Sequence, residues 1–230
     1  MMFRHSCVAG FVVLILLVSP LAAQAPDEKA VAEAVRKSGG EIKTDERAPD
    51  KHVDGVVFNQ KKSSPDGLAQ LSAFKSLRWL SLGTPKFGDE CFKDVKKIPT
   101  LRVLKLDNSA VTDIGLKMVA EMSDLEHLTL RKTAVTDEGM MEIKKLLKLR
   151  YLDASETKIT DAGLKELKGL RSLETVYLIA TDISDAGLRE LKALPNLQTL
   201  NVLNAKKVTK AGVTEFEKAC PKVNLVYKFK

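Results

Sequence analysis

Apolar residues recur along this chain with a period of 24 positions. The recurring leucines are Leu77, Leu101, Leu125, Leu149, Leu173 and Leu197. Each opens a similar phrase (LRWLSL, LRVLKL, LEHLTL, LRYLDA, LETVYL, LQTLNV), and a divergent copy, VDGVVF, opens at Val53. Self-similarity at a fixed period of this length is typical of stacked coils. We therefore predict seven repeats over residues 53–222.

The two halves of each repeat carry different patterns. In the first half, apolar and polar residues alternate, which predicts a short strand with one buried face. In the second half the apolar spacing becomes about three, which favours a helix. Thr112 stands where a side chain can cap that helix, and Asp113 follows at the positive end of the helix dipole. Glycine recurs in most copies at the position of Gly115, which predicts that the start of the helix closely approaches a neighbouring coil there. Cys91 takes this place in one copy.

A single coil of this kind cannot bury its own leucines, so the copies must stack. We predict an α/β solenoid of right-handed βα coils, with a parallel sheet on the concave face and helices on the convex face. A small hydroxyl residue recurs after each strand, and we expect it to turn inward and bond to the loop backbone. These residues are Ser109, Thr133, Thr157 and Thr181.

These phrases resemble those of leucine-rich repeat proteins. Segments such as the one from Ile159 to Leu164 (ITDAGL) are similar to the cysteine-containing-like subtype, whose second half reads Ile-Thr-Asp-x-Gly-Leu. The resemblance covers about 53–222. Similar repeats occur in substrate-recognition subunits of ubiquitin ligases and in exported bacterial proteins. The chain has no F-box segment, and Thr or Ser stands where that subtype often has Cys. Together with the signal-like N-terminal segment described next, these departures favour the exported bacterial type.

The first 23 residues have the order of a secretory signal. Arg4 and His5 precede an apolar run from Val8 to Val18, and Ala22, Ala23 and Ala25 follow around the expected cleavage site at 22–25. The run is shorter than the roughly 20 residues that span a bilayer, so cleavage is favoured over a retained anchor. We predict an exported protein (periplasmic, cell-surface or secreted) without stable membrane insertion after cleavage.

The segments that flank the repeats are predicted to close the stack. Residues 24–52 carry helix start and stop signals and a hairpin pattern, which predict an N-terminal cap of a helix plus a hairpin strand. Residues 223–230 are predicted to form a C-terminal capping strand. The last repeat is longer than the others, and Lys206 and Lys207 are expected to bulge out there as a loop.

The cysteines of the repeats lie too far apart to pair. Cys91 and Cys220 belong to the second and seventh copies. Five strand spacings separate these copies by at least roughly 24 Å, whereas a disulfide needs Cα atoms within about 7 Å. We predict two free, mostly buried thiols.

The charge of the chain does not indicate a nucleic-acid partner. The formal net charge is +7, which matters only if the cations share one face. The basic residues at positions expected to face outward from the strands are Arg78, Arg102, Lys105, Arg131, Lys132 and Arg150. The acidic residues there are Asp54, Asp107, Glu126, Asp153, Glu156 and Glu174. These charges balance, so we predict no nucleic-acid binding.

The residues offer little for catalysis or metal binding. His127 lies diagonally from Asp153 on neighbouring predicted strands, with Ser81, Thr129 and Ser155 nearby, so a hydrolytic constellation can be drawn. An open sheet provides neither a water-excluding pocket nor an oxyanion hole. No His or Cys pair has ligand spacing. We predict no catalytic residue, no metal and no cofactor.

Aromatic residues on the predicted concave sheet indicate a macromolecular partner. Trp79, Val103, His127 and Tyr151 occupy one column, and Tyr177 follows in the next coil. Rigid exposed aromatics suit protein recognition, although scattered ones also occur without function. Lys105, Arg131 and Asp153 are placed to orient a partner. We predict a monomeric, non-enzymatic scaffold that binds a protein or peptide; a structural or envelope-associated protein that self-associates through its helices is the alternative, and an enzyme a distant third.

Overall fold

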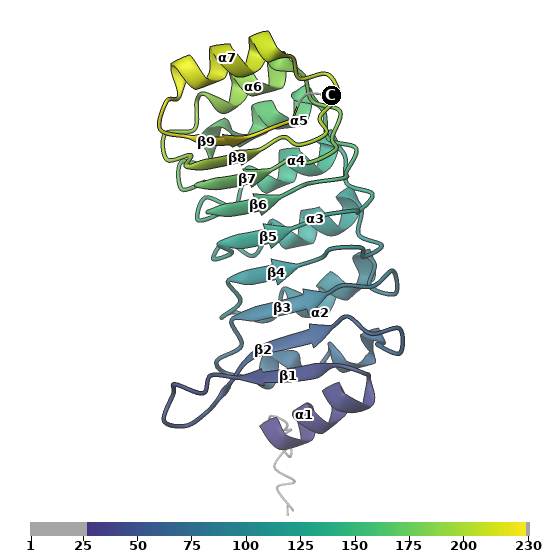
Figure 1. Cartoon of the computed structure of the whole chain (residues 1–230). Helices are drawn as coiled ribbons and strands as arrows, with labels where there is room; N and C mark the ends of the chain where they lie inside the picture. Colours follow the sequence, from purple (N-terminus) through teal and green to yellow (C-terminus); the bar gives the residue numbers. More distant parts are fainter. Residues whose placement is uncertain (1–26, 229–230) are drawn as a thin grey trace, which may run out of the picture.

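The computed structural model describes residues 27–228, in which nine strands form one sheet in chain order (Figure 1). The strands are β1 (Glu41–Thr44), β2 (Val53–Phe58), β3 (Trp79–Leu82), β4 (Val103–Lys105), β5 (His127–Thr129), β6 (Tyr151–Asp153), β7 (Thr175–Tyr177), β8 (Thr199–Asn201) and β9 (Asn224–Val226). Strands β2 to β9 run parallel, and β1 pairs with β2 antiparallel. The predicted signal segment, residues 1–23, lies outside the described residues.

Helices and turns lie on one side of this sheet (Figure 1). The α-helices are α1 (Glu28–Lys37), α2 (Phe92–Val95), α3 (Asp113–Val119), α4 (Asp137–Ile143), α5 (Asp161–Lys165), α6 (Asp185–Leu191) and α7 (Lys210–Ala219). The 3₁₀ turns are η1 (Pro65–Gly67), η2 (Leu71–Ala73), η3 (Asp89–Cys91) and η4 (Glu166–Gly169). The predicted α/β repeat solenoid is confirmed. The second half of the first coil, however, forms 3₁₀ turns where the pattern predicts a helix.

The strand register repeats the sequence period. Leu104 pairs with Leu80 on one side and with Leu128 on the other, each 24 residues away. The last pairing, Leu200 with Leu225, is 25 residues apart, so the final coil carries one extra residue. Lys206 and Lys207 are exposed in this longer coil.

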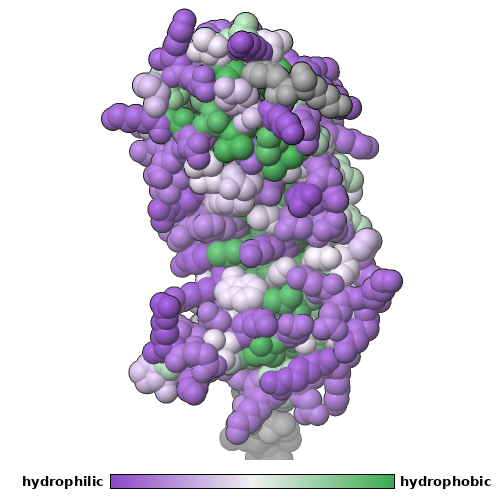
Figure 2. Space-filling view, in the orientation of Figure 1, coloured by the Kyte–Doolittle hydropathy of each residue, from purple (hydrophilic) through white to green (hydrophobic). Residues whose placement is uncertain are grey.

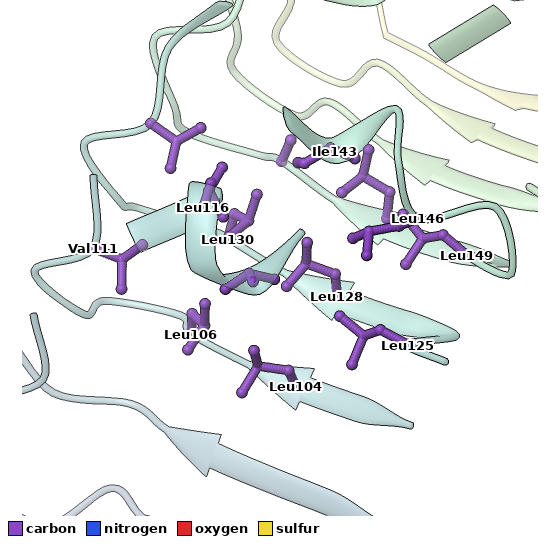
Figure 3. Close-up of a cluster of buried hydrophobic side chains, with 14 of the residues drawn as sticks. Leu104, Leu106, Val111, Leu116, Leu125, Leu128, Leu130, Ile143, Leu146 and Leu149 are labelled. Carbon is purple, nitrogen blue, oxygen red and sulfur yellow. The ribbon is translucent and has the colours of Figure 1, made fainter. Parts of the chain in front are cut away.

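The core is a continuous apolar layer between the sheet and the helices. Figure 3 shows Leu104 and Leu128 from the strands pointing toward Leu116 and Ile143 from the helices. All four side chains are at most 1% exposed. Each coil therefore fills the interior with leucines that its neighbours cover, which is how a repeat protein obtains a core without a globular centre.

The two ends of the stack differ. At the N-terminal end, Asp27 caps α1 and accepts from the Lys29 N–H, and Val31 and Val35 are buried on the inner side of this helix. At the other end, β9 lies within the segment expected to hold the last strand. The residue boundaries assigned to leader, cap and repeats stay predictions.

The helix starts are tied to the coil before them by aspartates. Thr112 caps α3, as predicted, by accepting from the Ile114 N–H at 3.2 Å. Asp89, from the preceding coil, accepts from the Thr112 N–H at 2.8 Å, the Thr112 hydroxyl at 2.6 Å and the Gly115 N–H at 3.0 Å. The next aspartates along the stack, Asp113, Asp137, Asp161 and Asp185, accept from the helix-capping residue of the following coil in the same way. We call these five residues the aspartate ladder.

The aspartate ladder explains the recurring glycine. A Cβ on Gly139 would lie 2.5 Å from Asp113 Oδ1, closer than real Cβ contacts allow. Cys91 occupies the equivalent place in the second coil, where the coil below carries Pro65 instead of Asp. Without a carboxylate beneath it, this position accepts a side chain.

The small hydroxyl residues after the strands turn inward, as predicted. Thr133 is 8% exposed and donates its hydroxyl hydrogen to the Leu130 carbonyl at 2.6 Å. The equivalent bonds are made by Ser109, Thr157 and Thr181. Each bond holds the loop that leads from strand to helix.

Ser155 and Cys220 differ in burial from what their use in the sequence analysis implies. Ser155, drawn into the hydrolytic constellation with His127 and Asp153, is fully buried, and its Oγ accepts from the Ile179 N–H at 3.1 Å. The reason is that the chain turns inward directly after β6. Cys91 is buried, as expected, whereas Cys220 is only half-buried because it ends α7 in the last coil.

Candidate binding surface on the sheet

The outward surface of β2 to β9, here called the sheet face, presents the predicted column of residues in register. Trp79 pairs with Val103, Val103 with His127, and His127 with Tyr151. All four side chains are partly exposed. The leucines that follow them in the same strands point into the core. Each strand is therefore held by the core and presents one side chain of the column to solvent.

Three of the aromatic rings form a cluster. The rings of His127 and Tyr151 stack with centroids 5.6 Å apart, and Tyr151 meets Tyr177 edge to face at 5.4 Å. Tyr177 comes from β7, where it pairs with Asp153 of β6. Burial, with the Asp153 charge adding to it, raises the pKa of Tyr151 to about 12. The Tyr151 hydroxyl is therefore protonated at neutral pH and available as a donor.

Trp79 lies apart from this cluster. A Cβ on Gly55 would overlap the Trp79 indole, so the indole covers Gly55 on the β2 side. Val103 stands between Trp79 and His127 in the register. The predicted column therefore exists, but its aromatic residues form two separate groups. Gly55 was the sequence signal for the separate placement of Trp79, because only a residue without a side chain leaves room for the indole ring.

Most charged residues of the sheet face are held by neighbours within the chain. Arg131 pairs with Glu156 at 2.6 Å, and Arg150 with Glu174 at 2.8 Å. The Arg131 guanidinium lowers the pKa of Glu156. Asp153 accepts from the Ser155 N–H at 2.9 Å. Of the predicted orienting residues, Arg131 and Asp153 are thus already engaged.

Lys105 is different from the other predicted orienting residues. Its side chain is exposed, and within residues 27–228 it makes no ion pair or side-chain hydrogen bond. It lies on β4 between Ser81 and Thr129, two small side chains that are largely buried. Its ammonium group is therefore free to meet a partner.

The hydrolytic constellation is not assembled. His127 faces the Tyr151 ring, and no hydrogen bond joins it to Asp153 in the part of the chain that the structure describes. Thr129 donates its hydroxyl hydrogen to Asp107 at 2.9 Å, and Ser81 donates to Asn59 at 3.0 Å. Among the described residues no group of three or more His, Cys, Asp or Glu is placed to hold a metal ion. These side chains stabilise the sheet.

Apolar surface extends from the tyrosines toward the end of the stack. Ile179 lies just after β7, Leu203 lies just after β8, and Val226 is the last residue of β9. Each of these side chains is partly exposed. Figure 2 shows apolar surface (green) gathered near the top of the view, over β7 to β9. Together with Tyr151 and Tyr177 these residues make what we call the apolar strip.

An open groove lies at the edge of the sheet where β3 and β4 begin. Its volume is about 590 Å³. It is lined by Lys75, Ser76, Arg78, Thr100, Arg102, Val103 and Glu126. Lys75 was not among the residues singled out from the sequence, because it lies in the loop before β3 and belongs to the groove only once the coils are stacked.

This architecture defines an open repeat solenoid with an exposed sheet. A family model described as a leucine-rich repeat region matches residues 56–222. The chain belongs to the leucine-rich repeat family. A comparison with curated proteins found no match.

Two solved structures with a similar fold are internalins from Listeria monocytogenes. Internalin C2 has a TM-score of 0.57 at 17% identity, over 89% of this chain and 94% of the internalin. Internalin inlF has a TM-score of 0.55 at 21% identity, over 71% of this chain. The match spans 44% of that longer protein. At these identities the likeness concerns the fold.

No helix among residues 27–228 is both long and apolar enough to cross a bilayer.

Proposed function

We propose that this protein is a non-enzymatic scaffold that binds a protein or peptide through its sheet face. The observation that carries the proposal is the cluster of His127, Tyr151 and Tyr177, partly exposed on strands that the core holds rigid. Large rings with few rotatable bonds give contact area at a small entropic cost, and they are enriched at protein interfaces.

The proposed contact residues are those predicted from the sequence. They are Trp79, Val103, Lys105, His127, Arg131, Tyr151, Asp153 and Tyr177. We expect the rings to contribute most of the binding energy, because buried aromatic anchors dominate most interfaces. Arg131 and Asp153 should contribute less, since each already has a partner within the chain.

The proposal includes the setting in which the scaffold works. We propose an exported protein of the bacterial type, of the Ile-Thr-Asp-x-Gly-Leu subtype, that acts as a monomer. The signal-like order of residues 1–23 and the repeated motif support this. We propose that nucleic acid is not the partner, because most cations of the sheet face are paired with acids and form no continuous basic patch.

Affinity capture with matched variants tests the proposal. The purified protein is used to capture partners from the native organism, beside the double variant Trp79→Ala/Tyr151→Ala and the control Lys117→Ala on α3. We expect the double variant to lose about tenfold or more of the captured partner, and the control to lose none. Equal capture by the double variant, with an unchanged circular dichroism spectrum, would place the binding site elsewhere.

A second candidate function is self-association through the helical side. Ile114 and Met141, on α3 and α4, and Leu147, in the loop after α4, are 63%, 47% and 63% exposed. Apolar side chains in solvent on one side of a solenoid can pack against a second copy. Sedimentation at several protein concentrations distinguishes the two functions. A monomer at all concentrations supports the scaffold, and a dimer that Ile114→Ser and Leu147→Ser dissolve supports self-association.

A further inference from the structure

We infer that the partner segment is an extended peptide with carboxylates at one end and apolar side chains at the other, crossing the strands from β3 and β4 to β7 and β8. This inference rests on the proposed function, because it names the chemistry of the peptide that the sheet face would bind. It comes from the distribution of unpaired charge and of apolar surface along the stack.

Two cations on the sheet face lack an internal counter-ion. Arg102, Arg131, Lys132 and Arg150 each lie within 4.0 Å of an acid. Arg78 and Lys105 make no ion pair within the described part of the chain. Both are exposed, and they lie on the neighbouring coils that hold β3 and β4. Among the six basic residues at the outward strand positions, those without an ion pair to residues 27–228 are therefore confined to the coils of β3 and β4, where Asp54 of the preceding coil and Asp107 are the neighbouring acids.

The groove beside Arg78 concentrates this charge. Lys75, Arg78 and Arg102 line it together with a single acid, Glu126. The Arg102 N–H donates to the Arg78 carbonyl at 2.7 Å, so the two arginines leave the sheet on adjacent strands. Arg102 pairs with Asp124 at 3.2 Å, whereas within residues 27–228 neither Arg78 nor the Lys75 ammonium group makes an ion pair; the Glu28 carboxylate accepts only from the Lys75 backbone N–H, at 3.3 Å. A carboxylate in the groove would supply the missing charge, and arginine binds it in a fork of two hydrogen bonds.

The other end of the sheet face carries no charge within its strands. Neither Thr175–Tyr177 nor Thr199–Asn201 contains an acidic or basic residue, and the apolar strip crosses them. Burial of Tyr177, Ile179 and Leu203 by apolar side chains of a peptide would be favourable there, whereas a charged side chain would lose solvation. The sheet face thus has two cations, unpaired within the described chain, toward one end and the apolar strip toward the other.

The strand spacing sets the length of the peptide. Three to four strand steps separate β3 and β4 from β7, or about 14–19 Å at 4.8 Å per step. An extended chain covers this distance with about four to six residues at roughly 3.3 Å each. The acidic and apolar residues of the partner should therefore be separated by about that number of positions.

Selection from a random peptide library displayed on phage tests the inference on the whole purified protein. We expect enriched sequences with Asp or Glu about four to six positions from Leu, Ile, Phe or Tyr. For the best synthetic peptide, Arg78→Glu/Lys105→Glu should weaken binding about tenfold or more, and Lys117→Glu on α3 should leave it unchanged. Replacing the acids of the peptide by Lys should restore binding to the Arg78→Glu/Lys105→Glu variant, which shows that this variant is folded.

The possible failures have different meanings. If no peptide is enriched, the sheet face does not bind peptides, and the proposed function fails together with the inference. If the enriched peptides lack acids, or ignore the charge reversal, the inference alone is overturned. Equally tight binding of polyglutamate or heparin, which have no apolar side chains, would replace the peptide with a general polyanion and would also overturn it.

Discussion

The first two coils and the five that follow obtain their stability in different ways. The first two contain Phe58, Phe74, Phe87 and Phe92, all at most 1% exposed, and their second halves form 3₁₀ turns and the short helix α2. The later coils are filled mainly by aliphatic residues and begin their helices with Thr or Ser caps. Aromatic packing at one end is replaced by a repeated hydrogen-bond pattern along the rest.

The difference shows which parts of a repeat are required by its neighbours. The aspartate ladder begins at Asp89 in the second coil, and the glycine requirement begins one coil later, at Gly115. In the last coil, Lys210 follows the capping Thr209, where the second to sixth coils carry an aspartate. The ladder aspartate is thus present where a following coil makes use of it, whereas the glycine occurs already in the first coil, at Gly67, where a Cβ would lie 3.1 Å from Ser38 Cβ.

The largest effect is expected from the aromatic packing of the first coils. Phe87 is fully buried and meets the Phe58 ring at 5.4 Å. Phe87→Ala should lower the free energy of unfolding by about 3–5 kcal/mol, and Phe87→Leu by only about 1 kcal/mol. Urea unfolding measures both. Hydrogen exchange should show lost protection in β2 to β4 and retained protection in β6 to β8; an equal loss along the whole chain would contradict the contrast.

The aspartate ladder should give the next largest effect. Asp113→Ala removes three hydrogen bonds to the next coil, and Gly139→Ala places a methyl group against the same carboxylate. Each should cost about 2 kcal/mol. Because the methyl group collides with Asp113, the double variant should lose clearly less than both costs combined. Additive losses in this double-mutant cycle would show that the glycine is needed for another reason.

Ionisation of the Cys91 thiol, in the second coil, should make the free energy of unfolding depend on pH in the alkaline range. Burial, with the Glu90 charge adding to it, raises the pKa of this thiol from 9.0 to about 11. Between these pH values the unfolded chain has released a proton that the folded chain keeps, so stability should fall as the pH rises from 9.0 to about 11. Thermal unfolding over this range should show a shallower fall in Cys91→Ala. An unchanged slope in that variant would exclude the thiol as the cause.

The smallest effect is expected from the ion pairs between helices of the later coils. Lys168 Nζ lies 2.6 Å from Glu190 in the next coil, with half of the lysine side chain exposed. Lys168→Ala should lower the free energy of unfolding by only about 0.5 kcal/mol, and salt should remove the difference. Lys165→Ala, which removes an exposed lysine without such a pair, is the control. A loss as large as that of Asp113→Ala would mean that these pairs hold the coils as firmly as the ladder does.

Much of the fold could be predicted from the sequence because the period is local. The phrase that begins at Leu125 specifies strand β5, and Thr136 marks the start of helix α4. Both could be assigned before any contact was known. The binding surface could be predicted only in part. The column of Trp79, Val103, His127 and Tyr151 follows from the period, but the placement of the Trp79 ring over Gly55 depends on the neighbouring strand.

The sequence by itself determined the repeat, the strands, the helix caps and the order of side chains on the sheet face, because each depends on residues within a single coil. The tertiary structure decided the interactions between neighbouring coils. Lys132, Glu156 and Ala180 adopt left-handed backbone with φ of 53° to 57°, which their residue types do not favour. The N–H of each donates to a carbonyl of the next coil, so the stack imposes this conformation. The pairing of Arg131 with Glu156, and the lack of an ion pair at Arg78 and Lys105 among the described residues, were decided in the same way, since a count of charges does not show which of them can reach one another.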